Sequence, residues 1–281
     1  MLKKILKALG FLILFLVVIG GTLYMIYLRP FIEKMKVTTL KSYDKNLTLV
    51  LGGGGNSGIL VSDSLVLVID TKMDDAGKAL YEQVKQLAGD KPILVVNTHI
   101  HPDHTKGNKF YKDVTIMAGG NYSKEQWIKE DGAESLPNKW LQDTMDVRMG
   151  DETATIYNLR KNIHTNSDIV VYLHKRKMLF TGDIVLNKQA PFILGAADPE
   201  GYLAAFDYFT SKFDIQTIVP GHGDIGGVDV IATFKQYFLD MKTAANDASQ
   251  KNKLEAKYAD WNQIPFMMST GATIKAFQKK K

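Results

Sequence analysis

The pattern of hydrophobic and polar positions divides the chain into an apolar first segment and a mixed body. An uncharged run covers residues 8–28 and follows lysines at positions 3, 4 and 7. A helix of about 20 apolar residues crosses the hydrocarbon core of a bilayer. Because no small-residue cleavage site follows the run, we expect residues 1–30 to be an uncleaved membrane anchor rather than a cleaved signal peptide.

Residues 31–43 are then expected to link this anchor to the body. A signal anchor leaves the N-terminus inside and the body on the extracytoplasmic side, as a single-pass membrane protein. Cleavage of the segment would instead give a secreted or periplasmic protein. Basic residues lie on both sides of the apolar run, within positions 3–7 and 29–36, so the charge pattern leaves the orientation open.

From position 47 the body alternates short β-rich runs with turns and amphipathic segments. The β-rich runs predict strands over residues 47–51, 58–61, 65–69, 92–97, 114–117, 153–159, 169–173, 178–180 and 216–219. Helical spacing of apolar residues predicts helices over 74–88, 123–130, 200–213 and 230–245, the first capped by Asp74 and ended by Gly89. Strand runs followed by strand–helix units indicate an α/β domain with two helix-covered sheets, over residues 44–245.

Two remaining segments are assigned by composition. The glycine run 52–55 lacks the Gly-Lys-Ser/Thr sequence and the following helix of a phosphate loop, so it predicts a tight turn between strands. Residues 246–281 form a polar C-terminal extension with a basic tail. We expect Trp261 and Phe266 to dock this extension onto the body.

Composition narrows the possible metal ligands and binding partners. The 281-residue chain has no cysteine, which excludes disulfides and thiolate metal ligands. Its net charge of +5 comes from lysines at the two ends, and the body without them is slightly acidic. The body carries no basic stripe with interleaved aromatic residues, so nucleic acid is not an expected partner.

The segment NTHIHPDHTKGN, residues 97–108, holds three of the six histidines of the chain. His99 and His101 follow a predicted strand, where alternate residues point the same way and can grip one ion. Asp103 and His104 come after Pro102, where the chain turns, and can face a neighbouring point. Clustered histidine and aspartate at a strand end is typical of a metal site with nitrogen and oxygen ligands.

Three more candidate ligands follow predicted strands or lie between them. His164 lies in NIHTNSD, Asp183 in LFTGD and His222 in IVPGHGD. Loops at strand ends can bring distant ligands together on a rigid scaffold. The sixth histidine, His174, lies in a charged turn and is expected to be exposed and not to bind metal.

These motifs resemble those of the metallo-β-lactamase superfamily. THIHPDH is similar to its H-x-H-x-D-H signature, and HTNSDIVVY with KMLFTGD and VPGHG is similar to its later ligand segments. The upstream GGNSGILV and VLVIDT agree as well, so the resemblance covers residues 46–227. It implies a four-layer αβ/βα sandwich with the metal site in the cleft between the sheet edges.

The resemblance also implies a dinuclear ligand set. The first ion would be bound by His99, His101 and His164, the second by Asp103, His104 and His222, and Asp183 would bridge the two. Zinc suits these ligands, and iron or manganese are also accepted by them. The implied activity is that of a metal-dependent hydrolase, in which a metal-bound hydroxide attacks a carbonyl group of a small-molecule substrate and Asp103 orients the hydroxide and moves its proton.

The sequence leaves the substrate class broad. β-Lactamases of the superfamily typically carry cysteine or serine where this chain has Asp183, which favours an ester, thioester, lactone or amide, as in hydroxyacylglutathione hydrolases and lactonases. The alternatives are β-lactamase activity, or a membrane-tethered scaffold whose metal site is not catalytic. The sequence leaves the oligomeric state open.

Two roles are open for several residues around the predicted site. Asp70 and Asp168 either hydrogen-bond ligating histidines or cap backbone at a strand end or turn. Residues 135–140 and 187–194 are expected to form loops over the cleft. Within them Lys139, Trp140 and Lys188 either touch substrate or serve ordinary packing and solvation.

Overall fold

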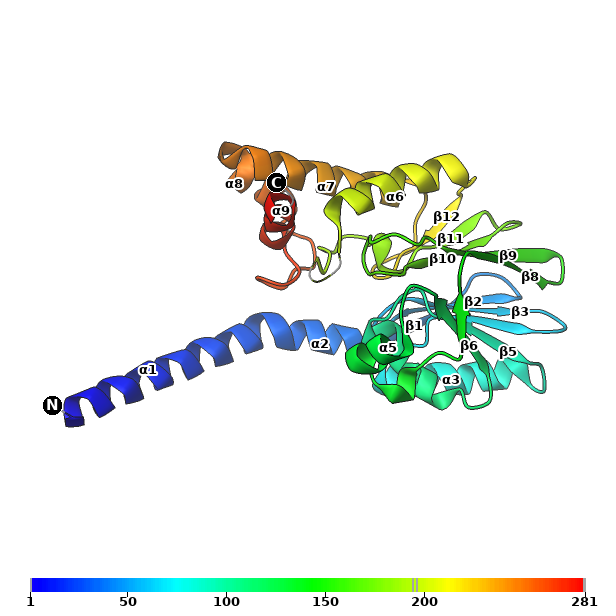
Figure 1. The fold of residues 1–281 in the computed structure, drawn as a ribbon, viewed down its shortest axis with the longest axis horizontal. Coiled ribbons are helices and arrows are strands. Elements are labelled where there is room, and N and C mark those ends of the chain that lie inside the picture. Colours follow the sequence, from blue (N-terminus) through cyan, green and yellow to red (C-terminus); the bar gives the residue numbers. More distant parts are fainter. Residues whose placement is uncertain (1, 194, 196, 280–281) are drawn as a thin grey trace.

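The computed structural model describes residues 2–193, 195 and 197–279 and contains two stacked β-sheets (Figure 1). The first sheet consists, in spatial order, of β1 (Thr38–Ser42), β2 (Leu47–Gly52), β3 (Ser57–Val61), β4 (Val66–Ile69), β5 (Ile93–Val96), β6 (Thr115–Gly119) and β7 (Lys139–Leu141). The second consists of β12 (Thr217–Val219), β11 (Met178–Phe180), β10 (Ile169–Leu173), β9 (Glu152–Asn158) and β8 (Thr144–Met149).

Strand direction explains where the functional loops meet. Strands β4 to β7 run parallel, with Ile69 of β4 paired with Val96 of β5. In the second sheet β11 and β12 are also parallel, with Phe180 paired with Val219. Parallel strands present their carboxyl ends at one edge of a sheet, so the loops after β4, β5, β11 and β12 emerge along these edges.

Helices cover both outer faces and complete the four-layer αβ/βα sandwich, as expected (Figure 1). Helices α3 (Asp74–Ala88) and α5 (Lys124–Asp131) lie on the first sheet, and α6 (Pro199–Lys212) and α7 (Asp229–Asn246) lie on the second. The central core between the sheets includes Leu49, Leu67, Ile156 and Val171, each fully buried. Burial of this apolar surface holds the two sheets together.

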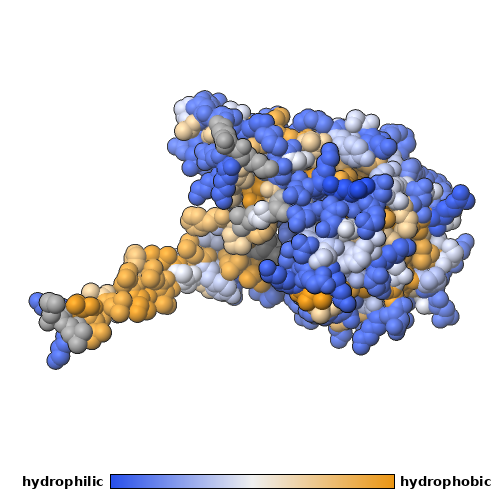
Figure 2. Space-filling model, in the orientation of Figure 1, coloured by the Kyte–Doolittle hydropathy of each residue, from blue (hydrophilic) through white to orange (hydrophobic). Residues whose placement is uncertain are grey.

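The N-terminal segment is one long helical stretch that projects from the body (Figures 1 and 2). It comprises α1 (Leu2–Leu23), a π-helical turn (Tyr24–Leu28) and α2 (Arg29–Lys36). Within residues 3–28, an 18-residue window has a mean hydropathy of 2.5, and none of that window is buried. The expected apolar helix is therefore present, and its length and composition suit either a membrane span or a signal sequence.

The structure adds strands that the hydropathy pattern did not reveal. Strand β1 lies within the expected linker and pairs with β2, with Leu40 opposite Val50, although all five of its residues are exposed. An edge strand without a buried face carries no alternation to detect. Strands β7 and β8 were missed as well, and β7 occupies part of the segment expected to be a loop over the cleft.

Two local predictions were wrong. Asp74 does not cap α3, because it is the first helical residue and Met73 takes the cap position without a side-chain hydrogen bond. The C-terminal extension forms α8 (Lys251–Lys257) and α9 (Thr270–Lys279), and Trp261 does dock, with its ring stacked 4.9 Å from that of Tyr237. Phe266 does not dock, since 81% of its surface is exposed.

Candidate metal centre

The structure brings all seven predicted ligands to one cleft between the sheets. His99 and His101 follow β5, and the short helix α4 (Pro102–Thr105) carries Asp103 and His104. Pro102 opens this helix at a position where its missing N–H costs nothing. The remaining three come from loops around the second sheet: His164 before β10, Asp183 after β11 and His222 after β12.

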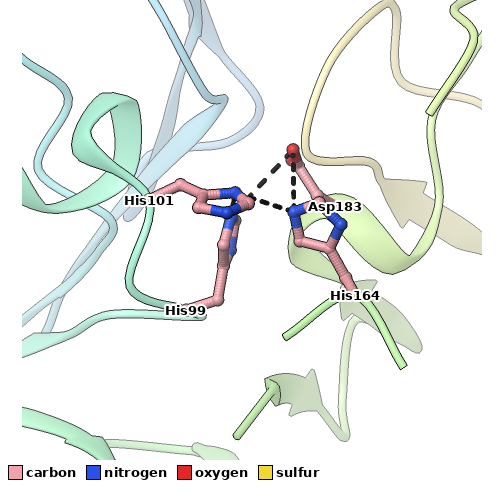
Figure 3. A group of neighbouring side chains, drawn as sticks. All are labelled: His99, His101, His164 and Asp183. Atoms are coloured by element: carbon pink, nitrogen blue, oxygen red, sulfur yellow. Dashed lines mark hydrogen bonds and ion pairs between the residues drawn. The ribbon is translucent and has the colours of Figure 1, made fainter. Parts of the chain in front are cut away.

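One group consists of three imidazoles and a carboxylate that point toward one another (Figure 3). Nδ1 of His101 lies 3.1 Å from Nε2 of His99 and 2.9 Å from Nε2 of His164. Oδ2 of Asp183 lies 3.6 Å from Nε2 of His164 and 4.0 Å from Nε2 of His99. Four potential ligand atoms thus lie within 4.8 Å of one another, close enough to face a single ion.

The second group is Asp103, His104 and His222, again with ligand atoms within 4.8 Å of one another. Oδ2 of Asp103 lies 3.1 Å from Nε2 of His222 and 3.7 Å from Nε2 of His104. The other oxygen of Asp183, Oδ1, lies 3.1 Å from Nε2 of His104 and 3.4 Å from Nε2 of His222. Asp183 therefore faces one group with each of its carboxylate oxygens.

The donor atoms fit a pair of bound cations. Among the described residues, buried side-chain atoms without a hydrogen bond include Nε2 of His104 and Oδ1 of Asp183, which lie close together but not in hydrogen-bonding geometry. A buried polar atom without a partner is costly. A metal ion would satisfy both atoms, and the imidazole and carboxylate set is one that zinc accepts.

The imidazoles of the first group are held in the neutral form, which can bind a cation. Burial, together with repulsion from neighbouring imidazoles, lowers the pKa of His99 well below its usual range. Burial likewise lowers the pKa of His101, and that of His164 to about 3. These three imidazoles are therefore neutral near pH 7, which is the state in which histidine binds metal.

In the second group the carboxylates outweigh burial and raise the pKa values of the imidazoles. Burial disfavours protonation of His104, but Asp70, Asp183 and Asp103 outweigh it and raise its pKa well above the usual range. Burial also opposes protonation of His222, while Asp183 and Asp103 raise its pKa to about 9. The carboxylates thus favour a positive charge on His104 and His222, and a bound metal ion can supply that positive charge in place of the protons.

Asp70 contacts a histidine predicted to bind metal, which agrees with one of its two interpretations. Its Oδ2 lies 2.8 Å from Nδ1 of His104, and it also accepts hydrogen bonds from the backbone N–H and the hydroxyl of Thr98. Asp168 does not contact an imidazole ring. It accepts from the backbone N–H groups of His164 and Thr165, so it caps the turn that carries His164.

Two residues that support the site were missed from the sequence. The hydroxyl of Tyr202, on α6, lies 2.7 Å from Nδ1 of His164. Lys72 is fully buried and its ammonium donates to the carbonyls of Val50, Gly52 and Gly55. No local motif marks either residue, because their partners lie far away in the chain.

Lys72 fixes the glycine turn that backs the second group. The expected tight turn is present, with positive φ angles at residues 52, 53 and 54. Gly55 packs against the ring of His104 so closely that a Cβ atom there would lie 2.2 Å from Cε1 of that ring. A residue with a side chain at this position would push the histidine away from the cleft.

Of the two segments expected above the cleft, residues 187–194 contribute to the lining of the cavity and residues 135–140 do not. The cavity beside the site, about 200 Å³, has an apolar wall of Leu186, Phe192 and Met268. Lys188 is exposed and does not line this cavity, and Leu194 lies outside the described residues. Lys139 is also exposed, and the ring of Trp140 packs 5.7 Å from that of Trp127.

His174 lies apart from the metal centre. It is exposed, as expected, and its Nε2 atom lies 2.7 Å from the hydroxyl of Thr155. Neither metal-compatible group found among the described residues includes it.

Comparison with known proteins agrees with this geometry. The chain is 26% identical to a metallo-beta-lactamase type 2 from Bacteroides fragilis over 185 residues, which cover 64% of this chain and 74% of the relative. It is 22% identical to an acyl-coenzyme A thioesterase, MBLAC2, from Gallus gallus over 169 residues, which cover 50% and 60% of the two chains.

A solved metallo-beta-lactamase from Pontibacter korlensis superposes with a TM-score of 0.63 and 19% identity, covering 73% of this chain and all of the other. A variant of the sec-alkyl sulfatase PisA1 gives a TM-score of 0.65 at 16% identity, covering 88% of this chain and 50% of the other. The family model for the metallo-beta-lactamase superfamily matches residues 50–222, which include all seven clustered side chains. The chain is therefore a hydrolase that belongs to the metallo-beta-lactamase superfamily.

Proposed function

We propose that this protein hydrolyses the ester or thioester bond of a small-molecule substrate at a dinuclear metal centre, with lactones and amides in the same class. The observation that carries the proposal is the position of Asp183, whose two oxygens face two separate groups of imidazoles. Two cations held close together repel each other, and a shared carboxylate offsets that repulsion.

The proposed ligand set follows the two groups. His99, His101 and His164 would hold the first ion, Asp103, His104 and His222 the second, and Asp183 would contact both. Zinc is the proposed metal, and iron and manganese also accept these ligands. When bound, such a pair supplies Lewis acidity that makes water acidic near neutral pH and polarises a carbonyl group.

Asp103 has the position of a catalytic base. It lines the cavity, and its carboxylate is only partly exposed. Burial opposes its ionisation, but His104 and His222 outweigh this and lower the pKa of Asp103, so the group stays ionised. An ionised carboxylate at the mouth of the site can orient the attacking water and carry its proton to the leaving group.

Two features support an acyl substrate. The cavity wall formed by Leu186, Phe192 and Met268 is apolar and suits a hydrocarbon chain beside the reacting carbonyl. The ring of Phe192 lies edge-on to His101 with their centroids 5.7 Å apart, so this wall reaches the ligands themselves. The carboxylate at position 183 favours ester or thioester hydrolysis over a β-lactam.

A second candidate activity is β-lactam hydrolysis. The 26% identity with the Bacteroides fragilis enzyme, over 74% of its length, is the observation that favours it. A scaffold without catalysis is less well supported, because all seven ligands are present and Asp103 faces an open cavity.

We also propose that residues 3–28 anchor the protein in a membrane, with the body on the extracytoplasmic side. At 1.5 Å per residue these 26 residues extend about 39 Å, enough to cross the hydrocarbon core with some tilt. N-terminal sequencing of the mature protein tests retention of the segment, since a new N-terminus beyond residue 28 would contradict an anchor.

The activity is tested by Asp103→Asn in the full-length, zinc-loaded chain, assayed on a panel of esters, thioesters, lactones and a β-lactam. Loss of the carboxylate should lower turnover by about 10²–10⁴-fold. The matched control is Asp75→Asn, an exposed carboxylate on α3, which should behave as the parent. Unchanged turnover in the folded Asp103→Asn variant would remove the proposed role, and the preferred substrate of the parent decides between acyl and β-lactam hydrolysis.

A further inference from the structure

A short hairpin in the C-terminal extension exposes large apolar side chains. Ile264 and Met268 close it with two backbone hydrogen bonds, of 2.7 and 2.9 Å. At its tip Phe266 is 81% exposed and has φ of +69°, and Met267 is 45% exposed. A bulky residue is rarely held in this backbone region, and here it presents the ring outward instead of burying it.

The tip of this hairpin lies beside the C-terminal end of the apolar helix. Phe266 and Tyr27 line the same groove, of about 580 Å³. Tyr27 belongs to the last turn of the apolar stretch 3–28. Figure 2 shows the hydrophobic surface of that helix reaching the body, so a membrane that surrounds the helix would meet the hairpin at its surface.

Charge on the groove suits a lipid headgroup region. Lys251 from α8 and Lys275 from α9 both line it, with Glu255 as the acidic residue among its lining. Lysines beside exposed aromatic and aliphatic side chains are the usual composition of a membrane-contacting surface. A protein partner is less suited, because the patch is continuous with a segment that already has the composition of a membrane span.

The base of the same hairpin reaches the metal cavity. Met268 forms part of the apolar wall beside the ligands. Asn262, just before the hairpin, exchanges backbone hydrogen bonds with the cleft loop, donating to Lys188 and accepting from Ala190. One short segment thus connects the mouth of the cleft with the end of the apolar helix.

We propose that this hairpin is a second membrane contact, in which Phe266 and Met267 enter the lipid interface and open the metal cleft toward the bilayer. The substrate class is then an ester or thioester whose acyl chain partitions into the membrane. This proposal rests on the proposed hydrolase function and on the N-terminal anchor. The contact with lipid is separable from turnover and can be measured without it.

The lipid contact is tested with Phe266→Trp in the full-length chain, reconstituted into vesicles of phosphatidylcholine and phosphatidylglycerol at 3:1. After subtraction of the parent spectrum, the added fluorescence should be blue-shifted and at least halved by lipids with brominated chains. The control is Val228→Trp, which is 48% exposed at the start of α7, sixteen residues or about 24 Å along that helix from the groove residue Ala244. Equal behaviour of the two tryptophans, or release of the parent by alkaline carbonate, would overturn the proposal.

The substrate class is tested with the double variant Phe266→Ser, Met267→Ser. Turnover of a long-chain acyl thioester held in vesicles should fall at least tenfold, while that of a soluble short-chain thioester stays within twofold. An equal loss on both substrates, or none on either, contradicts a membrane-fed cleft. If the parent turns over neither substrate, both the proposed hydrolase function and the proposed substrate class are contradicted. The quenching result still decides the lipid contact.

Discussion

The hydroxyl of Tyr202 lies 2.7 Å from Nδ1 of His164, although the two residues are 38 positions apart. Tyr202 is fully buried on α6, where its ring stacks 4.6 Å from that of Phe238. The phenol thus holds the imidazole by the nitrogen opposite the one that faces the cleft. A contact of this kind fixes the tautomer and the direction of a ligating ring.

Tyr202→Phe should therefore weaken metal binding by about 10–100-fold without loss of fold. Zinc affinity, measured by competition with a chelating dye, gives the readout. Tyr237→Phe is the matched control, because its hydroxyl makes a comparable buried contact with Thr273, 2.8 Å away. Equal zinc affinities for the two variants would show that the phenol does not orient His164.

Gly221 gives a second test, because its backbone passes directly behind Asp183. A Cβ atom at this position would lie 2.0 Å from Oδ1 of Asp183. Gly221→Ala should therefore displace the shared carboxylate and lower zinc affinity by at least about tenfold. Gly271→Ala is the control, since the nearest atom to its Cβ would be 3.5 Å away. A Gly221→Ala protein that keeps two tightly bound zinc ions would contradict the bridging position of Asp183.

Lys72 should make the stability of the body depend on pH. Burial lowers the pKa of its ammonium from 10.5 to about 7 in the folded protein. Below pH 7 both folded and unfolded chains hold the proton, and the folded state bears the full cost of the buried charge. Between pH 7 and 10.5 only the unfolded chain holds it, so the contribution of Lys72 to stability rises with pH, by about 2 kcal/mol from pH 7 to pH 9. In the metal-free chain His222, whose pKa is raised to about 9, contributes in the opposite direction, so the comparison is made between parent and variant.

Lys72→Met should remove this rise, while also losing the hydrogen bonds to three backbone carbonyls. Denaturant unfolding at pH 7, 8 and 9 measures the slope directly. Lys78→Met, on the exposed side of α3, should keep the parental slope. An identical pH dependence in parent and Lys72→Met would mean that the buried ammonium does not titrate in this range.

Metal content tests the dinuclear arrangement. Chelated full-length protein should take up two zinc ions per chain, and free zinc at about 100-fold over each Kd should add about 2.7 kcal/mol of stability per site. His222→Ala should lose one of the two ions, whereas His174→Ala should keep both, because His174 lies apart from the cleft. Elemental analysis that finds a single ion in the parent would contradict the two-group arrangement.

Local pattern was enough to predict the elements that have a buried face. The strands over residues 169–173 and 178–180 and the helix over 74–88 have the bounds expected from hydropathy, because each carries a run of apolar residues that must leave water. Strand β1 was missed because all five of its residues are exposed. Strands β7 and β8 were missed because each lies at a sheet edge and buries only one or two side chains, too few to give a clear hydropathy pattern.

The identity of the clustered residues also followed from the sequence. Six of them follow β5, β11 or β12, and parallel neighbouring strands bring such ends to a common edge. His164 instead precedes β10, which runs antiparallel to β11, so the start of β10 lies beside the end of β11. The sequence therefore determined which seven side chains meet. It did not separate Asp70, which contacts an imidazole ring, from Asp168, which caps backbone, because both stand beside a histidine-bearing loop and differ only in direction.

Tertiary structure alone decided which residues orient the site. Tyr202 and Lys72 each contact residues distant in the chain, so no spacing in the sequence relates them to the cleft. Hydrophobic periodicity reports whether a residue leaves water, and motifs report which chemical groups recur together. The partner that each buried hydroxyl or ammonium meets depends on how helices and sheets pack, and that is fixed only when the whole chain has folded.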